Sequence, residues 1–492
     1  MDSEQVIAYR QAKVERWRAR GIDPYPPRFR RTHTAQEAIA ALEGAQGSPQ
    51  APSTVAVAGR IVALRRMGRA TFIDLRDGSG RLQTYHRLDV LGEDAYQALD
   101  DLDLGDFLGV EGEMFRTRSG EPTLQAHSYT LLCKALRAPP EKWHGLQDTE
   151  TRYRQRYLDL MVNQEVRERF RLRQRIVQAV RRYLDQRGFL EVETPVLQPY
   201  AGGAAARPFQ TYHHALERHL YLRIALELHL KRLLVGGYER VYELGKVFRN
   251  EGITARHNPE FTMLEAYQAY ADYSDMMELT EGLVAYVARE ALGTLQVPCG
   301  DAVIDLTPPW PRLPLREAIR QHTGIDIGAL RDADALRQAA AALGLAVDPG
   351  WDWPKLVDEL LANCVEPRTL QPTFVVDYPV ELSPLAKAKP GAPGLVERFE
   401  LFVGGRELAN AYSELNDPQE QRRRFQEQAR RRAAGQQEVE TADEDFLVAL
   451  EHGMPPAGGL GLGIDRLVML LTGQSSIREV VLFPALREKG AS

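Results

Sequence analysis

The stretch of sequence that decides the fold runs from Val241 to Tyr267 and reads VYELGKVFRNEGITARHNPEFTMLEAY. It predicts two strands joined by a long polar loop, the first ending at Arg249 and the second opening at Phe261. Glu265 lies two residues before Tyr267, so both side chains are expected on one face of the return strand. A hairpin that only packs a core does not need charges at its rim, because unpaired buried charges are costly. Taken alone, the stretch also fits a solvated hairpin with a polar turn, and the rest of the chain decides between the two.

The hairpin resembles motif 2 of the class II aminoacyl-tRNA synthetases, with matching residues Phe248, Arg249, Asn250, Glu251, His257 and Phe261. Residues 170–197, FRLRQRIVQAVRRYLDQRGFLEVETPVL, resemble motif 1, a long helix leading into a strand. Residues 458–471, GGLGLGIDRLVMLL, resemble motif 3, a glycine-rich strand followed by a helix. Three motifs in the family's order are far more specific than any one of them. From about residue 55 onward the chain is most similar to the bacterial-type lysyl-tRNA synthetases.

Length and composition agree with that resemblance. A chain of 492 residues with 44% hydrophobic and 26% charged residues is typical of a globular protein with two or three domains. No run of 18 apolar residues predicts a membrane span, and the N-terminus has no apolar signal core. Cys133, Cys299 and Cys364 lie far apart, which excludes a zinc framework or disulfide scaffold and predicts a reducing, cytoplasmic location.

The predicted fold class is α+β and multidomain: an N-terminal OB-fold β-barrel and a class II antiparallel-sheet catalytic domain flanked by helices. Residues 1–53 are expected to form a basic helical arm that ends in the Gly/Ser/Pro-rich loop of residues 44–53. Residues 54–134 are expected to form the five-stranded barrel, residues 135–150 a linker, and residues 151–492 the catalytic domain with motif 2 at 241–267. An arginine-rich helix is expected from Arg152 to Arg182, and a helical insertion at 315–365. The arm either docks tRNA or packs on the barrel.

The resemblance implies where ATP binds. Joining a carboxylate to the α-phosphorus of ATP needs no general base, so catalysis reduces to positioning and charge neutralisation. Arg249 would bridge the α-phosphate and the attacking carboxylate, and Arg466 would contact the γ-phosphate and one face of adenine. Phe261 would stack on the other face of adenine. His257 would hold the triphosphate, and Glu251 would lie near the adenine amino edge or the acceptor end of tRNA. Glu400 and Glu407 match the carboxylates that hold Mg²⁺ against the phosphates.

The amino acid follows from the acids that remain. By similarity, Glu265 and Glu414 would hold the ε-ammonium of L-lysine, with Tyr267 and Asn410 assisting. Glu227 would take the α-amino group, and Gly203 would allow close backbone approach. An aspartate enzyme would need a cation in this pocket, and the sequence places none there. Two departures from the family pattern lie beside Glu227: Leu226 where proline is expected and His229 where an aromatic residue is expected.

The barrel acquires a role from the same resemblance. It would read the anticodon of tRNA-Lys, with Phe72 stacking on a base and Gln83 and Glu111 bonding to base edges. A core aromatic is the alternative for Phe72. Motif 1 lies at a dimer interface in this class, which predicts a homodimer.

The predicted activity is thus ATP-dependent formation of lysyl-adenylate and transfer of lysine to tRNA. The alternatives are an aspartyl- or asparaginyl-tRNA synthetase of the same subclass, a relative that lysylates another protein, and a non-catalytic tRNA-binding relative. The glycines at 459, 461 and 463 do not have dinucleotide-binding spacing, and His213, His214 and His219 are predicted to be surface residues rather than metal ligands.

Overall fold

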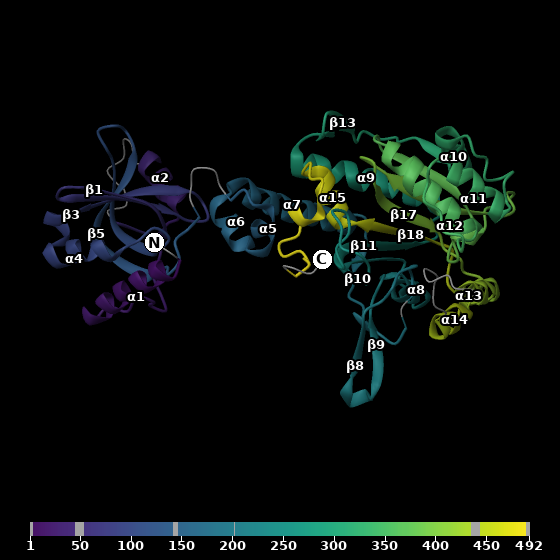
Figure 1. Ribbon diagram of the computed structural model, residues 1–492, viewed down its shortest axis with the longest axis horizontal. Coiled ribbons are helices and arrows are strands. Elements are labelled where there is room, and N and C mark those ends of the chain that lie inside the picture. Colours follow the sequence, from purple (N-terminus) through teal and green to yellow (C-terminus); the bar gives the residue numbers. More distant parts are fainter. Residues whose placement is uncertain (1–2, 45–53, 141–145, 201, 434–442, 489–492) are drawn as a thin grey trace. The chain divides into compact units, whose positions relative to one another are not determined.

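The structure is a computed structural model that describes residues 3–44, 54–140, 146–200, 202–433 and 443–488. The chain divides into two compact units, Met1–Gln147 and Asp148–Ser492 (Figure 1). The predicted loop at 44–53 lies outside the described residues from 45 onward, as do residues 141–145 of the predicted linker.

The first unit is a closed five-stranded barrel with the strand order β1-β2-β3-β5-β4. Its strands are β1 (Val55–Met67), β2 (Ala70–Arg76), β3 (Arg81–Arg87), β4 (Phe107–Arg116) and β5 (Pro122–Cys133), with short helices α3 (Leu88–Leu91) and α4 (Glu93–Ala98) after β3. Alternate residues of β2 and β3 point inward, and Ile73 and Leu82 are fully buried in the barrel core. The predicted OB-fold barrel is confirmed.

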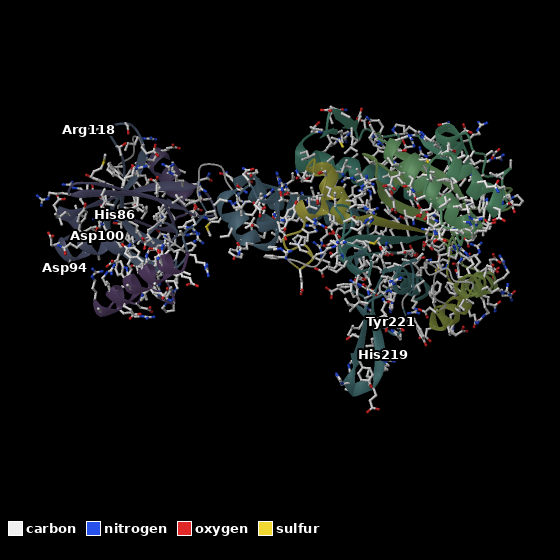
Figure 2. All side chains as sticks on the ribbon, in the orientation of Figure 1. His86, Asp94, Asp100, Arg118, His219 and Tyr221 are labelled. Atoms are coloured by element: carbon white, nitrogen blue, oxygen red, sulfur yellow. The ribbon has the colours of Figure 1, made fainter. Side chains whose placement is uncertain are left out.

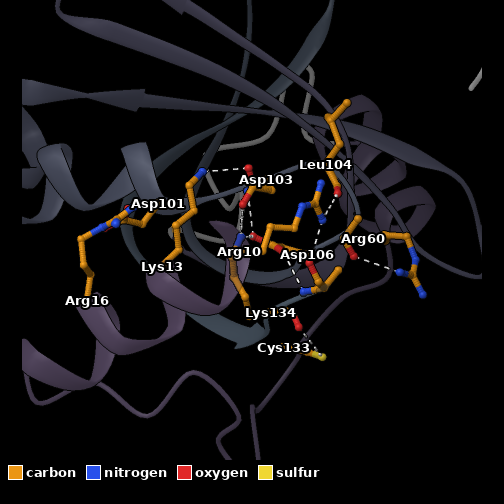
Figure 3. Close-up of polar contacts among 12 residues, drawn as sticks. Arg10, Lys13, Arg16, Arg60, Asp101, Asp103, Leu104, Asp106, Cys133 and Lys134 are labelled. Atoms are coloured by element: carbon orange, nitrogen blue, oxygen red, sulfur yellow. Dashed lines mark hydrogen bonds and ion pairs between the residues drawn. The ribbon is translucent and has the colours of Figure 1, made fainter. Parts of the chain in front are cut away.

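Two helices, α1 (Ser3–Ala19) and α2 (Ala35–Gly44), pack on this barrel. Trp17 of α1 is 1% exposed within the barrel's apolar cluster. Ion pairs also join this segment to the barrel: Lys13 Nζ lies 2.8 Å from Asp103, and Arg16 pairs with Asp101 (Figure 3). Arg20 pairs with Asp101 as well. The basic residues of the first helix therefore serve largely to dock it on the barrel.

A buried ion cluster lies beneath α1. Lys134, with a side chain that is 0% exposed, pairs with Asp103 and, at 2.7 Å, with Asp106. Arg10 donates to the carbonyl oxygens of Leu104 and Ala135 at 3.2 and 2.7 Å (Figure 3). Because each buried charge has partners, the cluster joins α1 to the barrel without leaving an isolated charge.

The second unit is built on an eight-stranded sheet with the order β14-β15-β16-β17-β18-β11-β10-β6. Its strands are β6 (Leu190–Glu191), β10 (Arg240–Phe248), β11 (Glu260–Ala269), β14 (Arg312–Pro314), β15 (Thr373–Pro379), β16 (Leu395–Phe402), β17 (Glu407–Ser413) and β18 (Ala457–Gly463). The pairs β6–β10 and β14–β15 are parallel, and the others are antiparallel. The unit also has two smaller sheets. One has the strand order β7-β9-β8 and is formed by β7 (Leu197–Gln198), β8 (Gln210–His213) and β9 (Arg218–Leu222). The other pairs β12 (Gln296–Cys299) with β13 (Ala302–Asp305). The predicted antiparallel-dominated sheet is confirmed.

Helices cover one face of the sheet. They are α7 (Gln164–Asp185), α9 (Tyr273–Leu292) and α15 (Ile464–Leu471), and their apolar residues form one cluster with inward residues such as Leu264 and Leu462. Other helices of the unit include α8 (Glu227–Val235), α13 (Pro418–Ala433) and α14 (Glu444–Glu451). Side chains alternate along β11, so Glu265 and Tyr267 lie on the opposite face from Leu264.

The single arginine-rich helix predicted from Arg152 to Arg182 is wrong. The structure has three helices there: α5 (Thr149–Arg154), α6 (Arg156–Val162) and α7. The break lets Arg156 turn inward, where it is fully buried, pairs with Asp159 at 2.5 Å and donates to the carbonyl oxygen of Leu482 at 3.0 Å. The contact with Leu482 joins residues far apart in the chain, so the local sequence pattern does not reveal it.

The region 315–365 folds as short amphipathic helices, α10 (Leu315–Thr323), α11 (Ala333–Ala342) and α12 (Trp353–Leu360), whose apolar residues form a cluster with residues of β15 and β16. Elsewhere in the unit, β8 and β9 form a projecting hairpin, on which Figure 2 shows His219 and Tyr221. Tyr212 makes edge contacts with His214 and His219 in this hairpin.

Within the described ranges, no helix is long and apolar enough to cross a membrane.

Candidate active site

Two rows of side chains cross the face of the sheet opposite to α7, α9 and α15. Strand register places Glu265, Gly461, Asn410 and Glu400 side by side on β11, β18, β17 and β16. The next row holds Tyr267, Gly459, Tyr412 and Arg398 on the same strands. Residues far apart in the chain therefore meet in one polar patch, and the central strand contributes only glycine to both rows.

The glycines keep this patch open. A Cβ atom on Gly459 would lie 1.9 Å from Glu414 Oε1 and 2.5 Å from the Tyr267 ring. A Cβ atom on Gly461 would lie 3.4 Å from Met263 Cε, so this position is only in ordinary contact. Gly459 is thus the glycine that a side chain could not replace without displacing its neighbours.

The patch forms the floor of a cavity of about 820 Å³. All six residues predicted to bind the amino acid line it: Gly203, Glu227, Glu265, Tyr267, Asn410 and Glu414. Arg249, Glu400 and Glu407 line it as well. Gly203 has φ +83°, and a Cβ there would approach Ala225 and Glu227 to 3.1 and 3.2 Å, so the close backbone approach depends on glycine.

An internal cation pairs with two acids of this pocket from behind them, contrary to the expectation that no cation is placed there. The fully buried ammonium of Lys231, on α8, pairs with Glu227 and, at 2.5 Å, with Glu414. Burial lowers the pKa of Lys231, but the Glu227 and Glu414 carboxylates outweigh that effect and raise it above its usual value. Glu227 and Lys231 are one helical turn apart, which explains why both reach the same point.

A second cation, Arg398, lies on β16. Its guanidinium donates to Glu400 at 2.5 Å and to Asn410 Oδ1 at 3.1 Å. Two further bonds, to Leu382 O at 2.7 Å and Ser383 Oγ at 2.9 Å, fix the side chain. The pocket is therefore not a bare cluster of acids, because three of its carboxylates, Glu227, Glu414 and Glu400, have internal cationic partners.

Glu265 is the carboxylate with the fewest charged partners. Its two oxygens accept from the Leu226 N–H at 2.8 Å and from the Tyr267 hydroxyl at 3.0 Å. Burial, with the nearby Glu227 charge, raises the pKa of Glu265 from 4.5 to about 7, while these hydrogen bonds oppose the rise. Burial also raises the pKa of Tyr267, so its hydroxyl stays a donor.

A second cavity, of about 270 Å³, adjoins the first. It is lined by all the residues predicted to bind ATP: Arg249, Glu251, His257, Phe261 and Arg466. Arg249 and Glu407 line both cavities. The Arg249 guanidinium lies 5.2 Å from the centroid of the Phe261 ring, and burial lowers its pKa. Arg249 therefore stands where the two cavities meet.

Glu400 and Glu407 lie on adjacent strands at the rim of the first cavity. Glu407 pairs with Arg466 at 3.0 Å, and Glu400 pairs with Arg398. The described residues contain no group of three or more His, Cys, Asp or Glu arranged to hold a metal by themselves. Glu407 also lines the second cavity. Two carboxylates side by side suit Mg²⁺, which binds few protein ligands and completes its shell with other oxygen ligands.

Local sequence reasoning missed Lys231, Arg398, Tyr412 and Gly459. Tyr412 donates to Glu227 Oε1 at 2.5 Å. Of the four, Lys231 carried a usable signal, because its four-residue spacing from Glu227 on a helix predicts a shared face. The others come together through strand register, which one strand alone does not reveal.

The barrel has an outward-facing aromatic strip. The rings of Phe72 and Tyr85 stack with centroids 4.6 Å apart, and Phe115 lies 6.0 Å from Tyr85. Gln83 accepts from Thr123 at 3.0 Å, and Glu111 is exposed. Phe72 is half-buried and lies outside the barrel's core cluster, so the core alternative for Phe72 is wrong.

Family models match both units. Residues 148–487 match the family described as tRNA synthetases class II (D, K and N), and residues 55–132 match the OB-fold nucleic acid binding domain. The fold and site define a class II tRNA synthetase that carries an OB-fold domain.

Relatives narrow this class. The chain is 55% identical over 491 residues to the lysine–tRNA ligase of Dehalococcoides mccartyi, spanning 99% of both chains. It is 56% identical over 487 residues to that of Moorella thermoacetica, spanning 98% of both, and 52% identical over 491 residues to that of Chloroflexus aurantiacus, spanning 99% of both. The chain belongs to the lysine–tRNA ligase family, as predicted from the resemblance that extends from about residue 55 onward.

Proposed function

We propose that this chain activates L-lysine with ATP and transfers it to tRNA-Lys, using the two adjoining cavities for the amino acid and the nucleotide. The observation that carries the proposal is that Arg249 lines both a cavity rich in acids and a second cavity lined by Arg466, His257 and Phe261. A guanidinium there can hold the lysine carboxylate and the α-phosphate together.

The main catalytic role of Arg249 would be to neutralise charge in the transition state. Two anions that repel must approach for the carboxylate oxygen to attack the α-phosphorus. A fixed cation between them stabilises the charge that develops in the transition state. Arg466 and His257, which line the nucleotide cavity, would hold the triphosphate so that pyrophosphate leaves in line. Phe261 offers a ring face to adenine, and Glu251 its carboxylate to the adenine amino edge or the acceptor end of tRNA.

The acidic cavity sets the amino acid. Glu265 and Glu414 would receive the ε-ammonium, assisted by Tyr267 and Asn410, and Glu227 the α-ammonium. A neutral or anionic side chain would leave these buried acids unpaired, which is how polar pockets reject analogues by large factors. Gly203 leaves room for the backbone of the substrate.

Mg²⁺ bound by Glu400 and Glu407 would neutralise part of the phosphate charge. Glu400 now pairs with Arg398, and Glu407 pairs with Arg466. For either carboxylate to bind Mg²⁺, the arginine that pairs with it would have to give part of its hydrogen bonding to the incoming phosphates. Both arginines can do so, because their N–H groups donate to phosphate oxygens as well as to carboxylates.

The outer strip of the barrel supports anticodon binding. Phe72, with Tyr85 and Phe115 beside it, offers stacking faces for unpaired bases, and Gln83 and Glu111 offer polar groups on neighbouring strands. A homodimer is supported by apolar residues exposed along motif 1, among them Leu190, Val196 and Leu197. A cytoplasmic location follows from the substrates.

Pyrophosphate exchange into ATP, measured with each amino acid in turn and without tRNA, tests the proposal. Exchange that depends on lysine is the expected result. Exchange driven by aspartate or asparagine would overturn the amino-acid assignment. If none of the amino acids supports exchange, the proposed activity is overturned.

A further inference from the structure

The acidic pocket has an internal counter-ion that does not itself line the cavity. Glu227, Glu265 and Glu414 face the cavity, whereas the Lys231 side chain is fully buried behind Glu227 and Glu414. The rings of Tyr412 and Phe446 enclose its ammonium at 5.4 and 5.7 Å. Lys231 is therefore placed to act on the pocket through its carboxylates, without touching a ligand.

Lys231 is the partner on which Glu414 depends. Both oxygens of the Glu414 carboxylate are buried and form no other hydrogen bond, and among the described residues no other cation pairs with it. Glu227 has an additional donor in the Tyr412 hydroxyl. A carboxylate buried with one partner is costly once that partner is removed.

The charges of the pocket can be counted. When Glu227, Glu265 and Glu414 are all ionised, they contribute three negative charges and Lys231 contributes one positive charge, so these four residues carry two net negative charges. The Lys231–Glu414 pair carries no net charge wherever its proton resides. Free lysine has two ammonium groups, and its carboxylate is assigned to Arg249. The two counts match.

We propose that Lys231 sets the specificity of the amino-acid pocket: it cancels one of three carboxylates, so that two negative charges face the two ammonium groups of lysine. This inference rests on the proposed function. A purely structural lysine would not need to pair with two cavity-lining acids, and replacing such a pair by apolar groups is often neutral for stability. Lys231 is thus a positioning residue, acting through Glu227 and Glu414.

The test is a mutant cycle on the full-length protein, read by pyrophosphate exchange. The variants are Lys231→Met, Glu414→Gln and the double variant, with lysine and norleucine as substrates. Norleucine has the same chain length but lacks the ε-ammonium. Lys231→Met is expected to raise the KM for lysine at least tenfold and to change the KM for ATP less than twofold.

The double variant separates charge balance from a structural role. Glu414→Gln alone leaves one net negative charge, whereas the double variant restores two. The preference for lysine over norleucine in kcat/KM is therefore expected to be at least tenfold higher in the double variant than in Glu414→Gln. Equal preferences in these two variants would overturn the inference, as would a lysine KM in Lys231→Met within twofold of wild type.

A matched control lies in the barrel. Lys134→Met also removes a buried lysine that pairs with two carboxylates, Asp103 and Asp106, but far from the sheet in sequence and in the other compact unit. It should leave the lysine KM in exchange unchanged. If Lys231→Met does not fold, the comparison of Glu414→Gln with the double variant still decides. If the wild-type protein shows no lysine-dependent exchange, the proposed function itself is overturned. That result differs from one in which the wild type is active and the variants behave like it, which overturns only the role of Lys231.

Discussion

The peptide N–H of Leu226 donates a 2.8 Å hydrogen bond to the Oε1 atom of Glu265. Leu226 stands where the family pattern predicts proline, and proline has no N–H to donate. This chain therefore holds the carboxylate assigned to the ε-ammonium with a backbone donor as well as the Tyr267 hydroxyl. A sequence departure thus has a direct consequence for the pocket.

Replacing Leu226 with Pro should weaken lysine binding near neutral pH. The backbone hydrogen bond lowers the pKa of Glu265, so its loss should raise that pKa further and leave more of the carboxyl protonated. We expect the lysine KM to rise severalfold at pH 7 and to approach the wild-type value near pH 9. Leu226→Ala keeps the N–H and is the control. Equal pH profiles for the two variants would contradict the role of this hydrogen bond.

Lysine binding by the wild-type protein should itself depend on pH. The pKa of Glu265 in the folded protein is about 7, against 4.5 ordinarily, so the folded form binds a proton that the unfolded form has lost. This group therefore favours folding at low pH, and its contribution is lost as pH rises through 7. The ε-ammonium needs the ionised carboxylate. The lysine KM should then rise as pH falls from 8 to 6, approaching tenfold per pH unit below 7, and Glu265→Gln should flatten that dependence.

Replacing Arg249 with Ala should abolish activation while leaving tRNA binding intact. Removal of one preorganised charge-stabilising donor typically lowers kcat by roughly 10²–10³-fold, and Arg249 serves both anions. Exchange measures the loss, and filter binding measures tRNA. Arg312→Ala is a control arginine, because Arg312 pairs with Glu281 on another part of the unit. Adenylate formation at the wild-type rate in Arg249→Ala would sink the mechanism.

Gly459 should tolerate no side chain. In Gly459→Ala the new Cβ would lie 1.9 Å from Glu414 Oε1, so Glu414 and Tyr267 must shift. We expect a fall in kcat/KM for lysine of at least tenfold, with a smaller effect on the KM for ATP. Gly78→Ala is the matched control, since a Cβ there meets nothing within 4 Å. Similar exchange kinetics for both variants would show that the pocket can absorb the change.

Sequence reasoning located the site hairpin closely, and the reason is local chemistry. Its strands were expected at residues 241–249 and from Phe261 onward, and they occur at Arg240–Phe248 and Glu260–Ala269. Arg398 was not predicted, because its place in the pocket depends on the whole sheet. The spacing of Lys231 from Glu227 indicates a shared helix face but not the contact with Glu414. The same limit applies to Arg156, which breaks a predicted helix to reach distant carbonyls. Motifs with fixed spacing are readable in one chain, whereas partners chosen by tertiary packing are not.

Phe72 should matter for tRNA and not for adenylate formation. Its ring stacks on Tyr85 at 4.6 Å on the outer side of the barrel, leaving an aromatic surface for an unpaired base. Stacking of a base on an aromatic side chain is worth about 1–3 kcal/mol. Phe72→Ala should therefore raise the KM for tRNA in aminoacylation between about fivefold and 150-fold, while lysine-dependent exchange stays at the wild-type rate. Phe107→Ala, an aromatic substitution on β4 where the ring lies against Arg60 instead, controls for damage to the barrel. If Phe72→Ala and Phe107→Ala raise the tRNA KM equally, the effect belongs to barrel stability and the anticodon role of Phe72 is wrong.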